Sequence, residues 1–188
     1  MLKRSSTLDS VYAPGKYPFE NSANIIFKEL NNLNLKQITC WSNTLSDTEI
    51  FFQKELNVQH SPKFNKGIIE KDFSLWRIEP LKWWILDKNI TLSEGLGSSL
   101  DLSHSFTCLY ISGKKSSLLL NRYLPIDLRE SQFQQASSAS SAIHHVSIKL
   151  LKFSNNNYYL FIPRGFALSI WEILLESAKQ FGYEILER

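Results

Sequence analysis

Apolar and polar positions in the second half of the chain first follow a strand pattern and then a helical one. The run 106–111 is continuously apolar and β-rich, and it breaks at Gly113. Apolar residues then recur at helical spacing over 114–124, and Pro125 stops this helix because proline lacks a backbone donor. The pattern therefore predicts a strand, a tight turn and a helix, followed by a new extended segment at 126–128.

The remaining part of this half predicts two more strands, a second helix and a final strand. Strands over 146–153 and 158–162 flank a run of three asparagines, which tolerate the positive φ of a hairpin turn. A helical apolar face begins at Phe166, and 183–186 reads as the last strand. The order β-α-β-β-α-β is typical of a ferredoxin-like plait, in which one sheet carries two helices on one face.

The first half predicts a shorter β-α-β-β series. A strand over 36–41 precedes a helix over 46–56, whose opening Ser-x-x-Glu sequence indicates a capping box. Strands over 73–78 and 83–86 follow, and the four residues between them predict a hairpin connection. The fold class is therefore α+β, with two β-α-β-β type halves.

The same pattern suggests a domain organisation. Proline and glycine interrupt residues 1–30, which we interpret as an extended N-terminal arm. Residues 31–188 then form a single α+β domain of two sub-lobes, about 31–100 and 101–188. The Ser- and Ala-rich stretch 134–141 predicts a mobile loop.

Composition narrows the functional class. A net charge of +3 in 188 residues, with scattered basic residues, disfavours nucleic acid as a partner. Cys40 and Cys108 belong to no Cys-x-x-Cys pair, so both are predicted to be core thiols. No apolar run approaches the ~18 residues of a membrane span, and the first residues lack a signal-peptide pattern. We therefore expect a soluble, cytoplasmic protein with no membrane partner.

The residues with catalytic potential do not assemble into a known motif. The turn at Gly113 lacks the further glycines of a phosphate-binding loop. His144 and His145 are adjacent and point to opposite faces of an extended segment, so they cannot bind one metal ion together. His104 follows Ser103, but no nucleophile-elbow sequence surrounds them, so a structural histidine is the favoured interpretation. We predict no catalytic, cofactor-binding or metal-binding residue in this chain.

Aromatic and cationic residues instead suggest a protein interface. Trp83 and Trp84 alternate along a strand, so one ring should enter the core while the other needs a cover, from this chain or from a partner. Arg164 could bind a carboxylate through two hydrogen bonds. Tyr12 and Tyr17 in the arm could fold over their own domain or dock on a partner. These five residues are the candidate interface.

Several stretches resemble the γ subunit of heterotetrameric sarcosine oxidase, a family within the folate-binding aminomethyltransferase superfamily. They occur in order and span nearly the whole chain: Tyr-Ala-Pro-Gly-Lys at 12–16, Pro-Leu-Lys-Trp-Trp-Ile-Leu at 80–86, Asp-Leu-Ser-His at 101–104, the Ile-Ser-Gly turn at 111–113, Leu-Pro-Ile-Asp-Leu at 124–128, and Ile-Pro-Arg-Gly-Phe-Ala-Leu-Ser-Ile-Trp at 162–171. The resemblance implies the first part of the aminomethyltransferase folate-binding fold.

It also implies a non-catalytic, cofactor-free subunit that supports assembly with α, β and δ subunits. Those partners would hold FAD, FMN, NAD and tetrahydrofolate, and the complex would convert sarcosine to glycine with formaldehyde or methylene-tetrahydrofolate and hydrogen peroxide. Two alternatives remain open: a γ-type subunit of a related N-methyl amino acid dehydrogenase, and a stand-alone folate-dependent one-carbon transferase. Folate binding by the isolated chain would separate the last class from the others.

Overall fold

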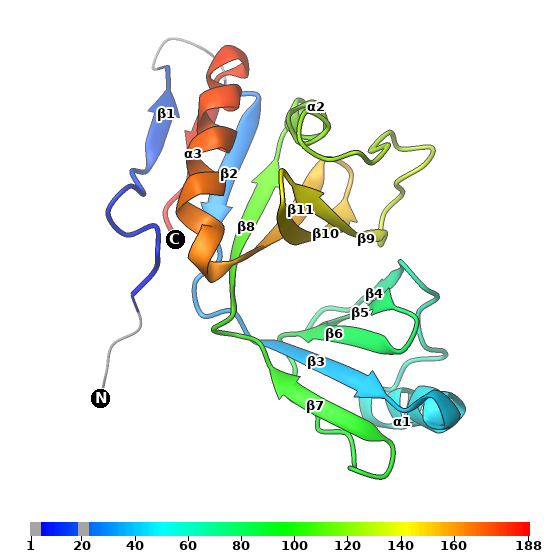
Figure 1. The fold of residues 1–188 in the computed structure, drawn as a ribbon. Helices are drawn as coiled ribbons and strands as arrows, with labels where there is room; N and C mark the ends of the chain where they lie inside the picture. The colour runs from blue at the N-terminus through cyan, green and yellow to red at the C-terminus, as the bar shows by residue number, and fades with distance from the viewer. Residues whose placement is uncertain (1–4, 19–22) are drawn as a thin grey trace. The chain divides into compact units, whose positions relative to one another are not determined.

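The computed structural model describes residues 5–18 and 23–188 and has the expected α+β composition (Figure 1). Contacts within the chain divide it into two compact units. The first unit contains Met1–Asn31, Ser105–Gln135 and Ser140–Arg188, and the second contains Asn32–His104 and Ala136–Ala139. This division differs from the predicted one, because the first 31 residues belong to a unit instead of forming a separate arm.

The first unit is built on a seven-stranded sheet with the order β1-β12-β2-β8-β11-β10-β9. Its strands are β1 (Gly15–Tyr17), β2 (Ile25–Glu29), β8 (Phe106–Ser112), β9 (Ser138–Ile143), β10 (Val146–Ser154), β11 (Asn157–Pro163) and β12 (Tyr183–Ile185). The predicted strands at 106–111, 146–153, 158–162 and 183–186 are confirmed. Asn156 has a φ of 57° in the turn between β10 and β11, as the asparagine run predicts.

The ferredoxin-like plait is present in an extended form. Its four strands β8, β10, β11 and β12 keep the spatial order of that motif, but β2 is inserted between β12 and β8. Strand β2 pairs parallel to β12 and antiparallel to β8. The predicted arm therefore supplies an internal strand of the sheet, and β1 extends the same sheet at its edge.

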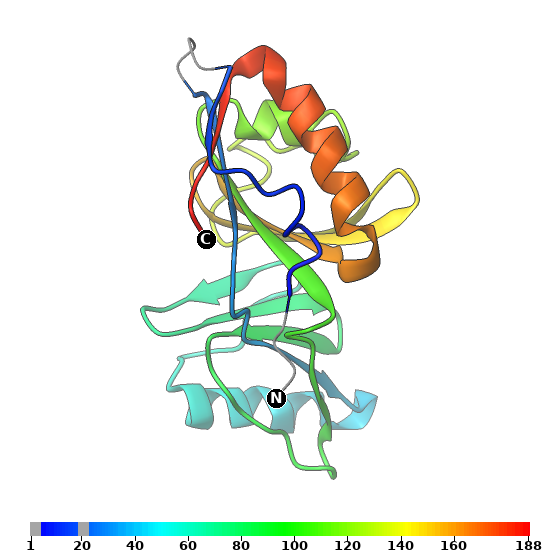
Figure 2. The ribbon, with the colours of Figure 1, turned by 90° about the vertical axis from the view of Figure 1, so that its left-hand side faces the viewer.

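Two helices pack beside each other on one side of the strands, as Figure 2 shows. They are α2 (Ser116–Leu120) and α3 (Ala167–Ala178), and short 3-10 turns at Arg164–Phe166 and Lys179–Phe181 flank α3. Helix α2 ends four residues earlier than predicted. Helix α3 buries Ile170, Trp171 and Leu174, whereas Phe166 is 47% exposed because it lies in the preceding turn.

The second unit is a five-stranded antiparallel sheet with the order β4-β5-β6-β3-β7 and one helix. Its elements are β3 (Leu35–Cys40), a 3-10 turn at Ser42–Thr44, α1 (Leu45–Leu56), β4 (Gly67–Ile69), β5 (Ser74–Glu79), β6 (Lys82–Leu86) and β7 (Gly97–Asp101). Phe52 and Leu56 of α1 pack with Ile38, Leu75 and Trp83 of the sheet in one apolar core. The predicted β-α-β-β series is confirmed, and β4 and β7 are additions.

Two sequence predictions are wrong in detail. Helix α1 begins one residue before Ser46, with Thr44 as its cap residue and no side-chain cap bond, because a 3-10 turn leads into it. Glu49 therefore does not close a capping box and instead pairs with Arg77 at 3.0 Å. The stretch 134–141 is not a loop throughout, because β9 begins at Ser138, which is buried. Serine and alanine do not form the alternation of strongly apolar and polar residues by which a strand is predicted from sequence.

Within the described residues, no helix has the length and apolar character needed to cross a lipid bilayer.

Gly113 follows β8 at a point where only a glycine fits. Its φ is 108°, and a Cβ there would lie 2.3 Å from the carbonyl oxygen of Asn24. We expect Gly113→Val to lower the free energy of unfolding by at least about 2 kcal/mol, from backbone strain and this clash. Chemical denaturation measures the change. Lys114→Ala and Lys115→Ala, both at exposed positions, are the controls, and a Gly113 variant as stable as these controls would contradict the prediction.

Candidate functional site

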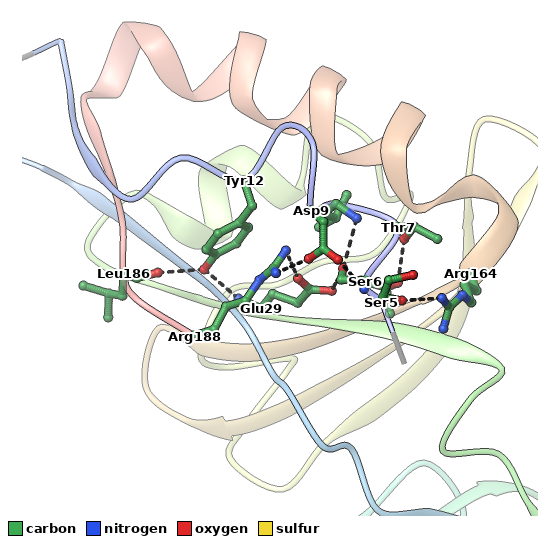
Figure 3. Close-up of polar contacts among 11 residues, drawn as sticks. Ser5, Ser6, Thr7, Asp9, Tyr12, Glu29, Arg164, Leu186 and Arg188 are labelled. Atoms are coloured by element: carbon green, nitrogen blue, oxygen red, sulfur yellow. Dashed lines mark hydrogen bonds and ion pairs between the residues drawn. The ribbon is translucent and has the colours of Figure 1, made fainter. Parts of the chain in front are cut away.

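A polar network joins the N-terminal segment of the first unit to β2 and to the C-terminal residue (Figure 3). Its centre is Glu29, which is 5% exposed at the end of β2. The Ser6 hydroxyl donates to Glu29 Oε1 at 2.5 Å, and Arg188 Nη2 lies 2.8 Å from Oε2. The second contact is an ion pair without an aligned hydrogen bond. Loss of Arg188 from this buried pair should cost more stability than loss of one partner from an exposed pair, because it leaves a buried carboxylate unpaired.

Arg188 connects three groups in this network. Its Nη1 donates to Asp9, and its guanidinium carbon lies 4.3 Å from the centre of the Tyr12 ring. The hydrogen bond from Arg188 lowers the pKa of the Asp9 carboxyl below its ordinary value. The Ser6 backbone N–H also donates to Asp9, at 2.9 Å. Arg188 thus connects Asp9 and Tyr12 to Glu29 of β2.

Tyr12 uses both its ring and its hydroxyl inside the first unit. The hydroxyl accepts the Glu29 backbone N–H at 3.0 Å and donates to the Leu186 carbonyl at 2.7 Å. The ring stacks on Trp171 with 5.6 Å between centroids. Burial raises the pKa of the Tyr12 hydroxyl. Of the two interpretations of the arm, these contacts favour a segment folded onto its own domain.

Tyr17 and Arg164 also contact their own unit. The Tyr17 ring stacks on Tyr183 at 5.1 Å, and its hydroxyl donates to the Ala13 carbonyl at 3.0 Å. Arg164 donates from Nη2 to the backbone carbonyl of Ser5. The contact found for Arg164 is therefore with a carbonyl oxygen, where the sequence suggested a carboxylate.

The two tryptophan rings of β6 lie on opposite faces of the sheet, as the alternation predicts, and both are covered in the isolated chain. Trp83 is fully buried against Phe52 of α1, with Arg77 over its ring at 4.9 Å. Trp84 points to the opposite side of the sheet, as alternation requires, but it is only 1% exposed and its indole N–H donates to Gln37 Oε1. Neither ring offers open surface for a partner, because both faces of β6 are covered.

The residues around His104 serve the backbone of the second unit. Asp101 Oδ1 accepts the Ser103 backbone N–H at 2.9 Å, and Ser103 Oγ accepts the Leu35 N–H at 3.0 Å. His104 itself is exposed. This arrangement positions a turn, and the hydrogen bonds from Ser103 lower the pKa of the Asp101 carboxyl below its ordinary value. Among the described residues, no group of three or more His, Cys, Asp or Glu side chains could hold a metal ion.

An open depression of about 400 Å³ lies on the first unit, between the end of α2 and the β9–β10 turn. Its lining residues are Arg122, Tyr123, Pro125, Ala142 and His144. Arg122 donates to Gln180 and lies over the Phe181 ring, and the Tyr123 hydroxyl donates to the Ile173 carbonyl. These contacts hold the walls of the depression in place, and none of them pairs a nucleophile with a base.

Exposed apolar side chains form the class of candidate contact residues that sequence reasoning missed. All of them have more than a third of their surface open: Leu118, Phe166 and Leu168 in the first unit, and Trp41, Ile50, Phe64 and Leu100 in the second. Trp41 and Phe166 were assigned to a predicted strand and a predicted helix face, and both lie just beyond those elements. Their exposure depends on where each element ends, which the apolar pattern does not specify.

Comparison with known proteins supports the fold. No family model matches the sequence, and neither does any curated protein. One similar structure is the heterotetrameric sarcosine oxidase from Corynebacterium sp. U-96 in complex with pyrrole 2-carboxylate, with a TM-score of 0.73 and 13% identity over 84% of this chain and 85% of that chain. Another is the glycine cleavage system aminomethyltransferase T from Bartonella henselae, with a TM-score of 0.56 and 11% identity over 87% of this chain and 48% of that one. The chain therefore has the fold of one sarcosine oxidase chain and of about half of an aminomethyltransferase.

We expect Tyr12→Phe to lower the free energy of unfolding of the isolated chain by about 1–3 kcal/mol. The change removes the hydroxyl that joins the Glu29 N–H to the Leu186 carbonyl, and unsatisfied buried polar groups are costly. Urea denaturation measures the loss. Tyr17→Phe is the matched control, since its hydroxyl bond to Ala13 is exposed. Equal stability of Tyr12→Phe and wild type would show that the network does not hold this segment.

Because Asp9 is paired with Arg188, we expect its contribution to the free energy of unfolding to be lost in acid. Its pKa is lower in the folded chain than the ordinary aspartate value of 3.8, so its ion pair stabilises the fold above that pH. The contribution is lost as the pH falls through the folded pKa. The difference in unfolding free energy between wild type and Asp9→Asn should therefore shrink as the solution is acidified below about pH 4. A difference that stays constant in acid would contradict the assignment.

Proposed function

We propose that this chain is a non-catalytic γ-type subunit of a heterotetrameric sarcosine oxidase. In this role it supports assembly with α, β and δ subunits, and those partners carry FAD, FMN, NAD and the tetrahydrofolate site. The complex would oxidatively demethylate sarcosine to glycine, with formaldehyde or methylene-tetrahydrofolate and hydrogen peroxide as the other products. The chain itself would contribute binding surface.

The observation that carries this proposal is the extent of the structural match. The aligned region covers 84% of this chain and 85% of one chain of the sarcosine oxidase, so the similarity in fold extends over most of both chains. The match to the aminomethyltransferase covers only 48% of that enzyme. The sarcosine oxidase chain is thus matched over a larger share of its length than the aminomethyltransferase is.

Two features of the side chains agree with a contact role. Seven large apolar side chains are exposed among the residues that the structure describes, and exposed apolar surface is typical of protein interfaces. The most suggestive polar residues, Ser103 and Asp101, are used in hydrogen bonds to the backbone. Both side chains therefore help to hold the backbone of the second unit in place.

A stand-alone folate-dependent one-carbon transferase is the second candidate. The aminomethyltransferase match favours it, since it extends over 87% of this chain. A γ-type subunit of a related N-methyl amino acid dehydrogenase would share the assembly role and differ in substrate. Titration of tetrahydrofolate into the isolated chain separates the transferase from both subunit proposals, because only the transferase should bind folate without partners.

The proposal predicts a separation between assembly and turnover. A tagged chain purified from its native cells should bring larger subunits with flavin absorbance, whereas the isolated chain should be colourless. Removing the chain should lower the yield of complex, while sarcosine turnover per assembled complex stays within a few-fold of wild type.

His104→Ala, at an exposed position, tests the contrary case. It should leave both the yield and the turnover of the complex near wild type. A large fall in turnover of a fully assembled His104→Ala complex would mean that the chain takes part in the chemistry and would overturn the assembly role.

A further inference from the structure

We propose that strand β7 of the second unit is a docking edge, to which a partner subunit adds one β-strand. The inference rests on the proposed function and names the surface through which that function operates. Strand β7 is the outermost strand of the five-stranded sheet and pairs with β3 on one side (Figure 1). Its other edge carries backbone groups whose directions follow from the register.

The hydrogen bonds of β3 show which residues of β7 point outward. Beyond the two ends of the β3–β7 ladder, Leu102 N–H donates to the Leu35 carbonyl and Trp41 N–H donates to the Leu96 carbonyl. In an antiparallel pair these bonded pairs alternate with pairs that are not bonded to each other. The even-numbered residues of β7 therefore bond to β3, and the odd-numbered residues direct their N–H and C=O groups away from it.

The other side of β3 gives an independent check. Asp87 N–H donates to the Asn34 carbonyl and Cys40 N–H donates to the Leu81 carbonyl, in line with β6. Even-numbered residues of β3 thus bond to β6, and its odd-numbered residues, including Leu35, bond to β7. The two sides are mutually consistent, so the alternation along β7 is fixed.

The outward groups are those of Ser99 and Asp101. Gly97 is also odd-numbered, but its N–H donates to the Ser93 carbonyl within the unit. The N–H groups of Ser99 and Asp101 have no hydrogen bond to the part of the chain that the structure describes. They lie two residues apart on one edge, a spacing of about 7 Å that matches the repeat of a facing strand.

The side chains of β7 leave this edge open to a strand. The strand Gly-Ser-Ser-Leu-Asp contains no proline and no lysine, the residues that commonly protect an edge. By contrast, Pro14 and Pro18 flank the edge strand β1 of the first unit. Leu100, the fourth of the five residues of β7, is 55% exposed and lies on the sheet face shared with Gln37. Unpaired donors and acceptors beside an exposed leucine match strand addition, in which the backbone gives affinity and alternate side chains give specificity.

These features describe the partner strand. It places an apolar side chain beside Leu100 on one face and a small side chain beside Ser99 on the other. Asp101 is an exposed carboxylate at the end of the edge, so the partner strand carries no acidic residue next to it. Four backbone hydrogen bonds, two each to Ser99 and Asp101, would complete the ladder.

Amide hydrogen exchange of the isolated chain and of the copurified complex tests the proposal. In the isolated chain the amides of Ser99 and Asp101 should exchange rapidly, while that of Leu100 is protected by β3. In the complex the Ser99 and Asp101 amides should slow by at least ten-fold. Rapid exchange of both amides in a complex that contains the partner subunits would overturn strand addition and leave the proposed function intact.

Variants separate this edge from other surfaces. Ser99→Pro removes the outward donor and should weaken subunit association by at least ten-fold. Ser99→Ala is its control, because it removes the Ser99 hydroxyl, which accepts the Leu92 N–H, but keeps the donor. Leu100→Glu should have a similar effect without touching the backbone of β7, and Ile50→Glu, at another exposed apolar position, should not.

Three outcomes contradict the proposal, each in a different way. Normal association of Ser99→Pro and Leu100→Glu would show that the partner binds elsewhere. A homodimer of the isolated chain that Ser99→Pro dissociates would identify a second copy as the occupant instead of a partner subunit. A chain that copurifies with no oxidase subunit would contradict the proposed function itself, and the occupant proposed for β7 with it.

Discussion

The first unit depends on the insertion of β2 into the centre of its sheet. Strand β2 is paired on both edges, with β12 and β8, so its backbone polar groups are satisfied without water. Ile25 and Phe27 on this strand are fully buried. In a plait without β2, β12 would pair directly with β8. The side chains of Ile25 and Phe27 would then lose their buried positions in the sheet. Strand β2 therefore joins two strands, β8 and β12, that are distant from it in sequence.

Both ends of β2 carry the specific contacts that this insertion requires. At its start, the carbonyl of Asn24 approaches Gly113 so closely that no Cβ can be accommodated there. At its end, the buried Glu29 needs a counter-charge, which Arg188 provides, while Ser6 and Tyr12 satisfy its other polar groups. The N-terminal segment is thus held because it completes the polar environment of β2. An aromatic segment that looks free in sequence is committed to its own domain for this reason.

The residues that the sequence suggested for a partner interface are used inside this chain. Tyr12, Tyr17 and Arg164 make contacts within the first unit, and the tryptophan pair of β6 is buried in the second. Among the described residues, the open features include exposed apolar side chains such as Trp41, Ile50 and Phe166, and the outer edge of β7. An edge strand is recognised through its backbone, so the residue types along it are unremarkable. The short stretch Gly-Ser-Ser-Leu-Asp carries little sequence signal even though its geometry is specific.

The amino-acid sequence determined the elements whose side chains alternate strongly or recur at helical spacing. The strand before Gly113, the asparagine hairpin, the helix that buries Ile170 and Leu174, and the β-α-β-β series of the first half were all predictable, because local periodicity reflects burial. The sequence also determined that Gly113 lies in a turn. The strands β7 and β9 were not predictable, since glycine, serine and alanine become strand residues only when a neighbouring strand pairs with them. Strand β4, Gly-Ile-Ile, was not predictable because three residues are too few to show a period. The partners of Glu29 and the outward groups of β7 depend on register between distant segments, and only the tertiary structure decided them.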